Sequence, residues 1–530
     1  MWQAKGAAGG TRIATGLPGQ LLALLAGVAQ AASLAWPWDV SGVTGGAALV
    51  RGAPLWWLQI FCMSALVGLL LRAASVRAAA LLGWLYALGW LSAGFGWLYT
   101  SMHSYGDLSA PLAALAVLTL GAALALYYAV ACMLFRLLAP VNQNLAALVF
   151  AALWTLAELA RGQWLTGFGW DAIGYAHVDG PLQAGFSWLG MYGVGALAAA
   201  LAASLALLIQ AGPLRSKWPP AVMVMALPLL TAALPDASGV AQGHLRVTLL
   251  QGNIAQEEKF QPATGILQAL RWYGEQLRSA QGDLVITPET AFPVLPEQLP
   301  DGYWQAMEHR FATGEQAALV GIPLGDDERG YTNSLLGWRP GAPDTWRYDK
   351  HHLVPFGEFI PPLFRWFTDL MQIPLGDFNR GALPQPTFDW KGQRIAATIC
   401  YENLFSEELA TQFTDAAKAP TLLLNISNLG WFGEHLAMDQ HLQIARVRAL
   451  EFARTFLLAT NTGRTAVVDH RGVVTHQTAP HTQGVLTATV QGRSGVTPYA
   501  RWSARWGQLP VWMCGLVVFG WAVWRRASNP

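Results

Sequence analysis

Charged residues are scarce in this chain of 530 residues. Lys, Arg, Asp and Glu make up 12% of it, against roughly 25% in ordinary soluble proteins, and 53% of the chain is hydrophobic. A composition of this kind is typical of a membrane protein. The net charge is only +1, so nothing in the composition indicates binding to nucleic acid, and we expect none.

The few charges are unevenly distributed. Residues 1–235 contain nine Lys or Arg and five Asp or Glu, whereas the remaining 295 residues contain the other 51 charged residues. The chain therefore divides into an apolar part, a larger water-soluble part and a final apolar run. We expect a seven-span bundle over 1–240, an external domain over 241–505, and a last transmembrane helix with its tail over 506–530.

Cysteine is also rare. The chain has four, and three of them, Cys62, Cys132 and Cys514, lie in apolar runs. The water-soluble part therefore holds one thiol, Cys400, which excludes a disulfide within that part and a zinc site built from several cysteines. We find no motif for another metal, a nucleotide or any other cofactor, so we expect none.

Eight apolar runs are long enough to cross a bilayer, which takes about 20 residues. Nine Lys or Arg residues flank these runs on one side and only Arg51 and Arg161 on the other. The positive-inside rule then predicts that both termini are cytoplasmic and that 240–505 lies in a periplasm-like compartment. The first run also resembles a cleavable signal peptide, but its removal would leave the domain outside as well. The runs lie near 17–36, 55–72, 77–99, 110–136, 143–160, 186–210, 218–235 and 508–524.

A transport function is not favoured. Glu158 is almost the only ionisable residue inside a run, and Arg161 follows it at a spacing that suits an ion pair on one helix. The chain shows no internal repeat of the kind that many transporters contain. We interpret the bundle as an anchor or a platform that handles lipid, with Glu158 and Arg161 as a structural pair at the membrane interface.

Strand and helix patterns alternate in the water-soluble part, which predicts a layered α/β domain of about 250 residues. The predicted strands are 245–251, 283–287, 317–322, 331–338, 344–350, 394–399, 421–425, 455–460 and 465–469, and the predicted helices are 265–279, 302–313 and 434–454.

Three residues suited to acyl transfer lie at the ends of predicted strands. They are Glu289, Lys350 and Cys400, and a helical pattern follows Cys400 from about Leu404. A carboxylate can take the proton of a thiol, a thiolate can attack a carbonyl carbon, and an ammonium can stabilise the resulting oxyanion. A helix N-terminus near the thiol would also favour the thiolate. Taken singly, each residue also has an ordinary structural explanation.

Together, in this order, the three residues resemble the Glu–Lys–Cys set of the nitrilase superfamily, whose fold is an α-β-β-α sandwich. Further segments are similar to bacterial apolipoprotein N-acyltransferases and are spread over the whole chain. The chain differs at Phe260, where tryptophan is frequent, and at the pairs that follow Lys350 and precede Trp431. None of these differences touches Glu289, Lys350 or Cys400. The similar segments are Leu165–Trp170, Asp179–Leu182, Val247–Ile254, Lys350–Phe359, Ile426–Gly433, Ala445–Glu451 and Gly495–Ala500.

The resemblance implies an integral membrane bundle of eight spans with an external nitrilase-like α/β domain. It implies an N-acyltransferase that moves a fatty acyl chain from a phospholipid of the phosphatidylethanolamine type to apolipoproteins. The acceptor would be the α-amino group of their N-terminal diacylglyceryl-cysteine, and Cys400 would carry the chain as a thioester. It also implies an inner-membrane location, with the catalytic domain facing the periplasm.

The resemblance extends to four supporting residues. Glu358 would be a second carboxylate that orients Lys350 or the incoming amine. Tyr401 and Glu402 flank the nucleophile and would shape its turn. Trp431 would close over the acyl chain, although an ordinary packing role suits it equally.

The segment Phe359–Phe378 is unusually apolar for the water-soluble part. Exposed apolar loops often contact membranes or ligands, so we expect a mobile arm that faces lipid. Folding of this segment onto the core of the domain is the alternative.

Two other functions stay open at this stage. One is a membrane-tethered amidohydrolase of nitrilase type, which would use the same three residues and pass the acyl group to water. The other is a non-catalytic scaffold that binds lipid or lipoprotein.

Overall fold

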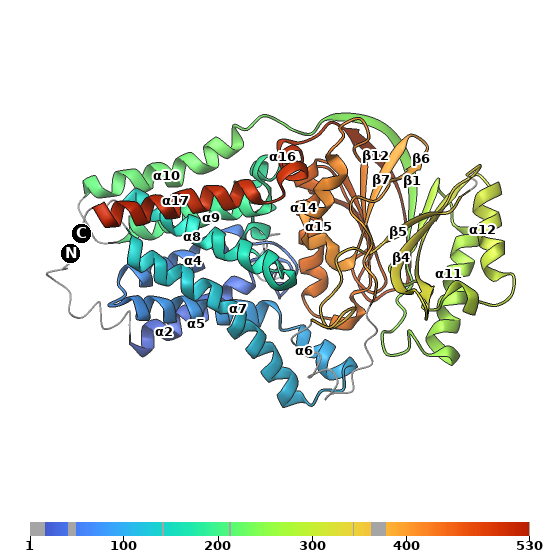
Figure 1. Ribbon diagram of the computed structural model, residues 1–530, viewed down its shortest axis with the longest axis horizontal. Coiled ribbons are helices and arrows are strands. Elements are labelled where there is room, and N and C mark those ends of the chain that lie inside the picture. The colour runs from blue at the N-terminus through green and yellow to red at the C-terminus, as the bar shows by residue number, and fades with distance from the viewer. Residues whose placement is uncertain are drawn as a thin grey trace. The chain divides into compact units, whose positions relative to one another are not determined.

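The computed structural model describes residues 16–40, 49–139, 143–210, 214–342, 344–361 and 378–528. The chain forms two compact units, which can be followed by colour and label in Figure 1. One comprises 1–103, 108–236 and 506–530, and the other comprises 104–107 and 237–505.

The first unit is helical, and a helix lies in each of the eight predicted apolar runs. Four of the described helices are long and apolar enough to cross a membrane, or five if the bent pair Pro498–Trp506 and Leu509–Ser528 forms one span. The structure therefore shows several membrane-type helices, while the number eight stays a prediction. The helices are α2 (Leu17–Ala31), α4 (Trp56–Leu71), α5 (Val76–Gly94), α7 (Ala110–Leu138), α8 (Gln143–Gln163), α9 (Phe186–Ile209), α10 (Leu214–Ala232) and α17 (Leu509–Ser528).

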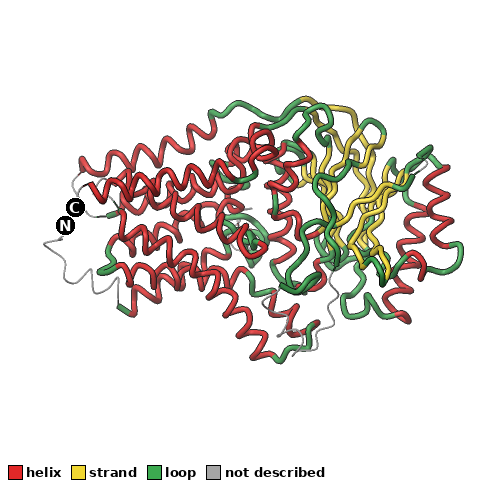
Figure 2. The backbone as a smooth tube through the Cα atoms, viewed as in Figure 1, coloured by secondary structure: helices red, strands yellow, loops and turns green. Residues whose placement is uncertain are grey.

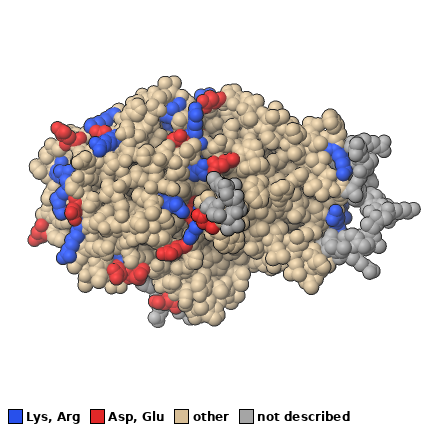
Figure 3. Space-filling view, turned by 180° about the vertical axis from the view of Figure 1, so that it is seen from behind, with Lys and Arg blue, Asp and Glu red and all other residues tan. Residues whose placement is uncertain are grey.

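Many apolar side chains of this unit are exposed. On α7 they include Leu115, Leu118 and Leu126. Figure 3 shows a broad area of the molecular surface that carries no charged side chain. An apolar surface of this kind on long helices is expected where a protein contacts lipid.

Glycines allow close approach of the helices in this unit. A Cβ atom at Gly27 on α2 would lie 1.9 Å from the carbonyl oxygen of Tyr86 on α5, and one at Gly89 on α5 would lie 2.4 Å from the carbonyl oxygen of Leu24. Small residues are common at helix contacts in membranes because they let backbones touch. The contact between α2 and α5 therefore depends on glycine.

Glu158 and Arg161 are both buried. Arg161 donates to the Tyr128 hydroxyl at 2.8 Å and to the carbonyl oxygens of Phe168 and Trp170, each at 2.7 Å. Its guanidinium thus satisfies main-chain oxygens of the segment that follows α8. The bundle therefore encloses both side chains, and their location at the membrane interface stays a prediction.

The second unit contains two sheets of six strands, ordered β12-β1-β2-β3-β4-β5 and β11-β10-β9-β8-β7-β6. Strands β1, β2 and β3 are parallel, as are β7, β8 and β9, and the other neighbours are antiparallel. The strands are β1 (Val240–Gln251), β2 (Leu284–Ile286), β3 (Ala317–Asp326), β4 (Gly330–Trp338), β5 (Trp346–Asp349), β6 (Phe388–Trp390), β7 (Gln393–Ile399), β8 (Leu422–Ser427), β9 (Thr455–Thr460), β10 (Ala466–Val468), β11 (Val474–Gln477) and β12 (Gly484–Ser494).

Three apolar layers hold this unit together. Alternate residues of the strands, such as Leu245 and Val247 of β1, fill the space between the two sheets. The outer face of the first sheet packs against α11 (Leu267–Ser279) and α12 (Tyr303–Thr313). The outer face of the second packs against the two helices α14 (Ser406–Ala410) and α15 (Ala437–Phe452), as Figures 1 and 2 show. The unit is therefore the predicted α-β-β-α sandwich, with strands buried on both faces.

Three strands, β6, β11 and β12, were not predicted. Strands β6 and β11 are short, and all of β11 except Val474 is exposed. Strand β12 alternates exposed and buried residues and pairs with β1, which lies far away in the sequence. The hydrophobic patterns in the sequences of these three strands are weak. Such strands are stabilised mainly by the neighbouring strands with which they pair.

Replacement of Gly27 by valine should destabilise the helical unit. The new side chain would overlap the backbone of α5, and overpacking of this kind costs about 2 kcal/mol or more. The thermal unfolding midpoint of the detergent-purified protein should fall by several degrees.

Gly68→Val on α4 is the matched control, since a Cβ atom there meets no other atom within 4 Å. Equal unfolding midpoints for the two variants would contradict the close contact between α2 and α5.

Candidate active site

The ends of several strands of the sandwich bring the predicted residues together. Glu289 follows β2, Lys350 follows β5, and Cys400 follows β7. Carboxyl ends of strands are where α/β sheets usually bind ligands. The two sheets thus place a carboxylate, an ammonium and a thiol at one edge of the domain.

The Lys350 ammonium lies between two carboxylates. Its Nζ atom is 3.3 Å from Oε1 of Glu289 and 2.9 Å from Oε1 of Glu358, and the residue is 1% exposed. Burial alone would lower the pKa of Lys350, but the charges of Glu358 and Glu289 outweigh it and raise the pKa above its ordinary value. Lys350 is therefore a cation at neutral pH.

Glu289 is buried but remains ionised. Its Oε1 atom accepts a hydrogen bond from the Asn333 amide at 2.7 Å, and its Oε2 atom accepts the main-chain N–H of Asn428 at 2.8 Å. Burial by itself would raise the pKa of Glu289, but Lys350 and these donors hold it below its ordinary value. The carboxylate is thus ready to accept a proton.

Asn333 is a site residue that the sequence did not reveal. Its Nδ2 atom donates to Oε1 of both Glu289 and Glu358, at 2.7 and 2.8 Å. Its carbonyl oxygen accepts the main-chain N–H of Lys350 at 2.9 Å. Asn333 on β4 therefore holds the two carboxylates with its side-chain amide and the backbone of Lys350 with its main-chain carbonyl. The only sequence signal is a polar triplet, Thr332 to Ser334, at the start of an apolar strand.

Cys400 has a strained backbone. Its φ of 53° is in the left-handed region, which residues other than glycine seldom adopt outside functional sites. It opens a short turn of 3₁₀ type, Cys400–Leu404, and α14 begins only at Ser406. The predicted strand end is confirmed. The helix expected from about Leu404 begins at Ser406, and the 3₁₀ turn connects it to the thiol.

The surroundings of Cys400 keep its sulfur protonated at rest. Burial, followed by the negative charge of Glu289, raises the pKa of the thiol, while the charge of Lys350 opposes this increase. A thiol beside an ionised carboxylate can lose its proton as the sulfur attacks. The arrangement therefore suits nucleophilic attack assisted by a base.

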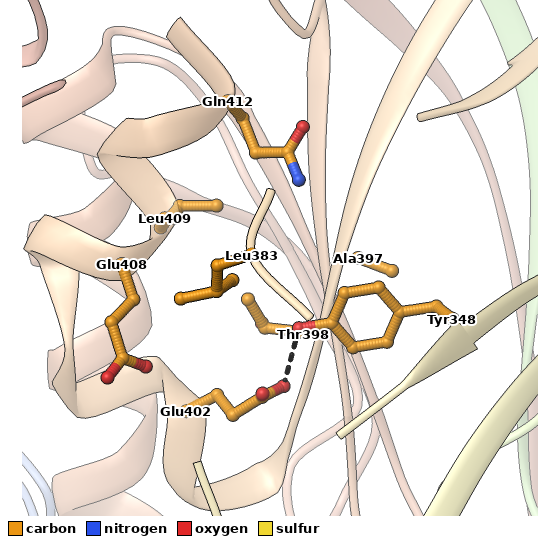
Figure 4. Close-up of a pocket in the computed structure, with 8 residues that line it drawn as sticks. All are labelled: Tyr348, Leu383, Ala397, Thr398, Glu402, Glu408, Leu409 and Gln412. Atoms are coloured by element: carbon orange, nitrogen blue, oxygen red, sulfur yellow. Dashed lines mark hydrogen bonds between the residues drawn. The ribbon is translucent and has the colours of Figure 1, made fainter. Parts of the chain in front are cut away.

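Glu402 connects the Cys400 strand to the Lys350 segment. Its Oε1 atom accepts the main-chain N–H groups of His351 and His352 at 2.6 and 3.1 Å, and its Oε2 atom accepts that of Ile399 at 2.6 Å. The Tyr348 hydroxyl donates to Oε2 at 2.9 Å, as Figure 4 shows. The adjoining cavity measures about 10 Å³, the space of roughly one water molecule, so it is no substrate pocket.

The remaining predicted residues differ in exposure. Tyr401 is buried, and its ring contacts those of His352 and Phe405. Trp431 is 39% exposed, and its ring lies 5.7 Å from that of Tyr105. Tyr401 is thus a buried packing residue, whereas part of the Trp431 indole is exposed. Most of the expected lipid-facing arm, residues 362–377, lies outside the described residues.

Comparison with known proteins gives matches over both parts of the chain. Residues 41–204 match the family model of the apolipoprotein N-acyltransferase N-terminal domain, and residues 246–499 match that of carbon-nitrogen hydrolase. An apolipoprotein N-acyltransferase of Verminephrobacter eiseniae is 52% identical over 509 residues, which cover 92% of each protein. One of Ralstonia nicotianae is 44% identical over 479 residues, covering 89% of this chain and 90% of that protein.

These similarities extend over the helical part and the sandwich alike, as the sequence motifs predicted. The chain therefore belongs to the apolipoprotein N-acyltransferase family, with a carbon-nitrogen hydrolase domain as its second part.

Proposed function

We propose that Cys400 carries the acyl chain as a thioester between the two substrates of a lipoprotein N-acyltransferase. Membership of the family makes the chain an N-acyltransferase of a bacterial membrane. The donor that we propose is a phospholipid of the phosphatidylethanolamine type. The proposed acceptor is the α-amino group of the N-terminal diacylglyceryl-cysteine of apolipoproteins.

One observation carries this proposal. A partly buried thiol, an ionised carboxylate and an ammonium occupy one edge of the sandwich, and each has the protonation state that acyl transfer needs at its start. These three groups can generate a nucleophile and stabilise an oxyanion.

In the first half of the proposed reaction, Glu289 takes the proton of Cys400 as the sulfur attacks the ester carbonyl carbon. Lys350 has three N–H groups and uses two on carboxylates, so one remains to donate to the oxyanion. When the C–O bond breaks, Glu289 returns the proton to the oxygen of the departing lysophospholipid. The acyl chain is then bound to sulfur.

In the second half, the neutral amine of the acceptor attacks the thioester carbon. Glu289 takes a proton from the nitrogen, the C–S bond breaks, and the sulfur leaves with that proton. The buried position of Glu289 and Lys350 keeps bulk water away, which favours the amine over water as acceptor.

Four residues support this chemistry in our proposal. Glu358 holds the Lys350 ammonium. Glu402 fixes the nucleophile turn, and Tyr401 packs below it. The exposed indole of Trp431 covers part of the acyl chain.

The proposed placement in the cell follows the distribution of basic residues. All eight apolar helices would cross the inner membrane, seven before 241–505 and one after it. Both termini would then be cytoplasmic and the catalytic domain periplasmic.

Cys400→Ala should abolish acyl transfer, with a loss of at least about a thousandfold. Incubation of the wild type with phosphatidylethanolamine should add one acyl mass to the protein, and hydroxylamine should remove it. The alanine variant should show no such adduct by intact mass spectrometry, and a diacylglyceryl-cysteine peptide should discharge the adduct of the wild type. Cys514→Ala is the matched control and should behave as the wild type.

Two outcomes would overturn the proposal. Discharge into water at the same rate without peptide would indicate an amidohydrolase. Full lipoprotein acylation by Cys400→Ala would remove the thioester from the mechanism.

Glu402→Gln should destabilise the catalytic domain by about 2 to 4 kcal/mol and slow formation of the adduct. Both carboxylate oxygens of Glu402 accept main-chain N–H groups. In either orientation of the glutamine amide, its NH2 group would therefore face a main-chain N–H donor and could not accept a hydrogen bond from it. Thermal unfolding and the rate of acylation measure the two effects. Tyr348→Phe removes only one of the hydrogen bonds and should cost about 1 kcal/mol. If Glu402→Gln is no more harmful than Tyr348→Phe, Glu402 does not brace the site.

A further inference from the structure

Lys259 is a second buried lysine beside the proposed nucleophile, and the mechanism above does not use it. It follows β1, just before the turn η6 (Pro262–Ile266). The residue is 2% exposed, and its Nζ atom donates to the main-chain carbonyl oxygen of Glu289 at 3.2 Å. The next side chain, Phe260, is exposed, so the backbone here directs the lysine inward and the aromatic ring outward.

The position of Lys259 is costly for a structural lysine. Among the described residues, no carboxylate lies within ion-pair distance of its ammonium, and the Glu289 carbonyl is its one hydrogen-bond acceptor. Burial lowers the pKa of Lys259 to about 8, although the charge of Glu289, and that of Cys400 once it is a thiolate, favours the ammonium. A buried cation without a close counter-ion is rare in proteins unless it has a function.

Lys350 alone does not balance the two carboxylates that it bridges. Glu289 and Glu358 carry two negative charges, and Lys350, placed between them, supplies one positive charge. The ammonium of Lys259 supplies the second. Without the Lys259 ammonium, the site would have an excess of negative charge before the reaction starts. A thiolate or an oxyanion would add a further negative charge, which is unfavourable in a buried site of low dielectric.

The described residues around Cys400 offer no other positive charge for this role. The titratable groups that face Cys400 are Glu289, Glu358 and Lys350, together with His441 of α15, which lies near the backbone of Cys400. Burial lowers the pKa of His441 to about 4, so this imidazole is neutral at neutral pH. Lys259 is thus the remaining source of positive charge among the described groups.

We propose that Lys259 is a positioning residue that holds Glu289 by its main-chain carbonyl oxygen and favours the Cys400 thiolate through its positive charge. This inference rests on the proposed function of Cys400 and Glu289. It adds a charge requirement, which has its own experimental signature. Lys259 acts through Glu289 and Cys400 and forms no bond to substrate.

The test measures how fast iodoacetamide alkylates Cys400 between about pH 6.5 and about pH 9.5, by mass spectrometry of the full-length protein in a Cys514→Ala background. Below about pH 8, Lys259→Met should react about tenfold more slowly than the parent protein. The difference should close to within about threefold near pH 9.5, because Lys259 of the parent then loses its own proton. Thioester formation from phosphatidylethanolamine at neutral pH should slow by about tenfold as well.

Two further variants separate charge from hydrogen bonding. Lys259→Gln keeps a hydrogen-bond donor for the Glu289 carbonyl but has no charge, so it should be alkylated at the same rate as Lys259→Met. If the methionine variant does not fold, the glutamine variant is used in its place. Lys259→Arg keeps the charge and should stay within about threefold of the parent over the whole range. Lys418→Met removes an exposed lysine of the same domain and should have no effect.

The inference would be overturned if the alkylation rates of Lys259→Met and the parent differed by the same factor at every pH. It would also be overturned if Lys259→Gln were alkylated as fast as the parent. Both results would make the lysine purely structural. The proposed function fails separately, if the wild type itself forms no acyl adduct on Cys400.

Discussion

The buried ammonium of Lys350, shared by Glu289 and Glu358, is the interaction on which the site depends. A lone ammonium in this position would lose its proton, and two buried carboxylates without it would bind one. Only the combination leaves Glu289 ionised beside a thiol that is still protonated. Asn333 donates a hydrogen bond to each of the two carboxylates. These hydrogen bonds, together with the Lys350 ammonium, hold the carboxylates at a fixed separation.

The sandwich supplies these charges from two separate sheets. Glu289 and Lys350 follow strands of the first sheet and Cys400 follows a strand of the second, so the apolar layer between the sheets sets their separation. Glu402 then joins the two sheets at the edge where the reaction would occur, through main-chain N–H groups on both sides. Packing and chemistry are therefore coupled: a shift of one sheet against the other would move the sulfur away from its base.

Sequence analysis succeeded where the signal is local. The apolar strands that lead to Glu289 and Cys400 are buried on both faces, and their composition shows it. It failed where conformation or partners come from elsewhere. The left-handed backbone of Cys400 was not predicted, and the contacts of Asn333 with two carboxylates from other segments have no local sequence signal.

The sequence alone determined the division into an apolar and a water-soluble part, the α/β class, the family and the three residues proposed for acyl transfer. Charge distribution, hydrophobic periodicity and short motifs encode these features locally. The tertiary structure decided the protonation states of Glu289 and Cys400, the bridging role of Asn333 and the inward position of Lys259. The reason is physical: a pKa depends on burial and on charges that segments distant in the sequence bring within a few ångströms.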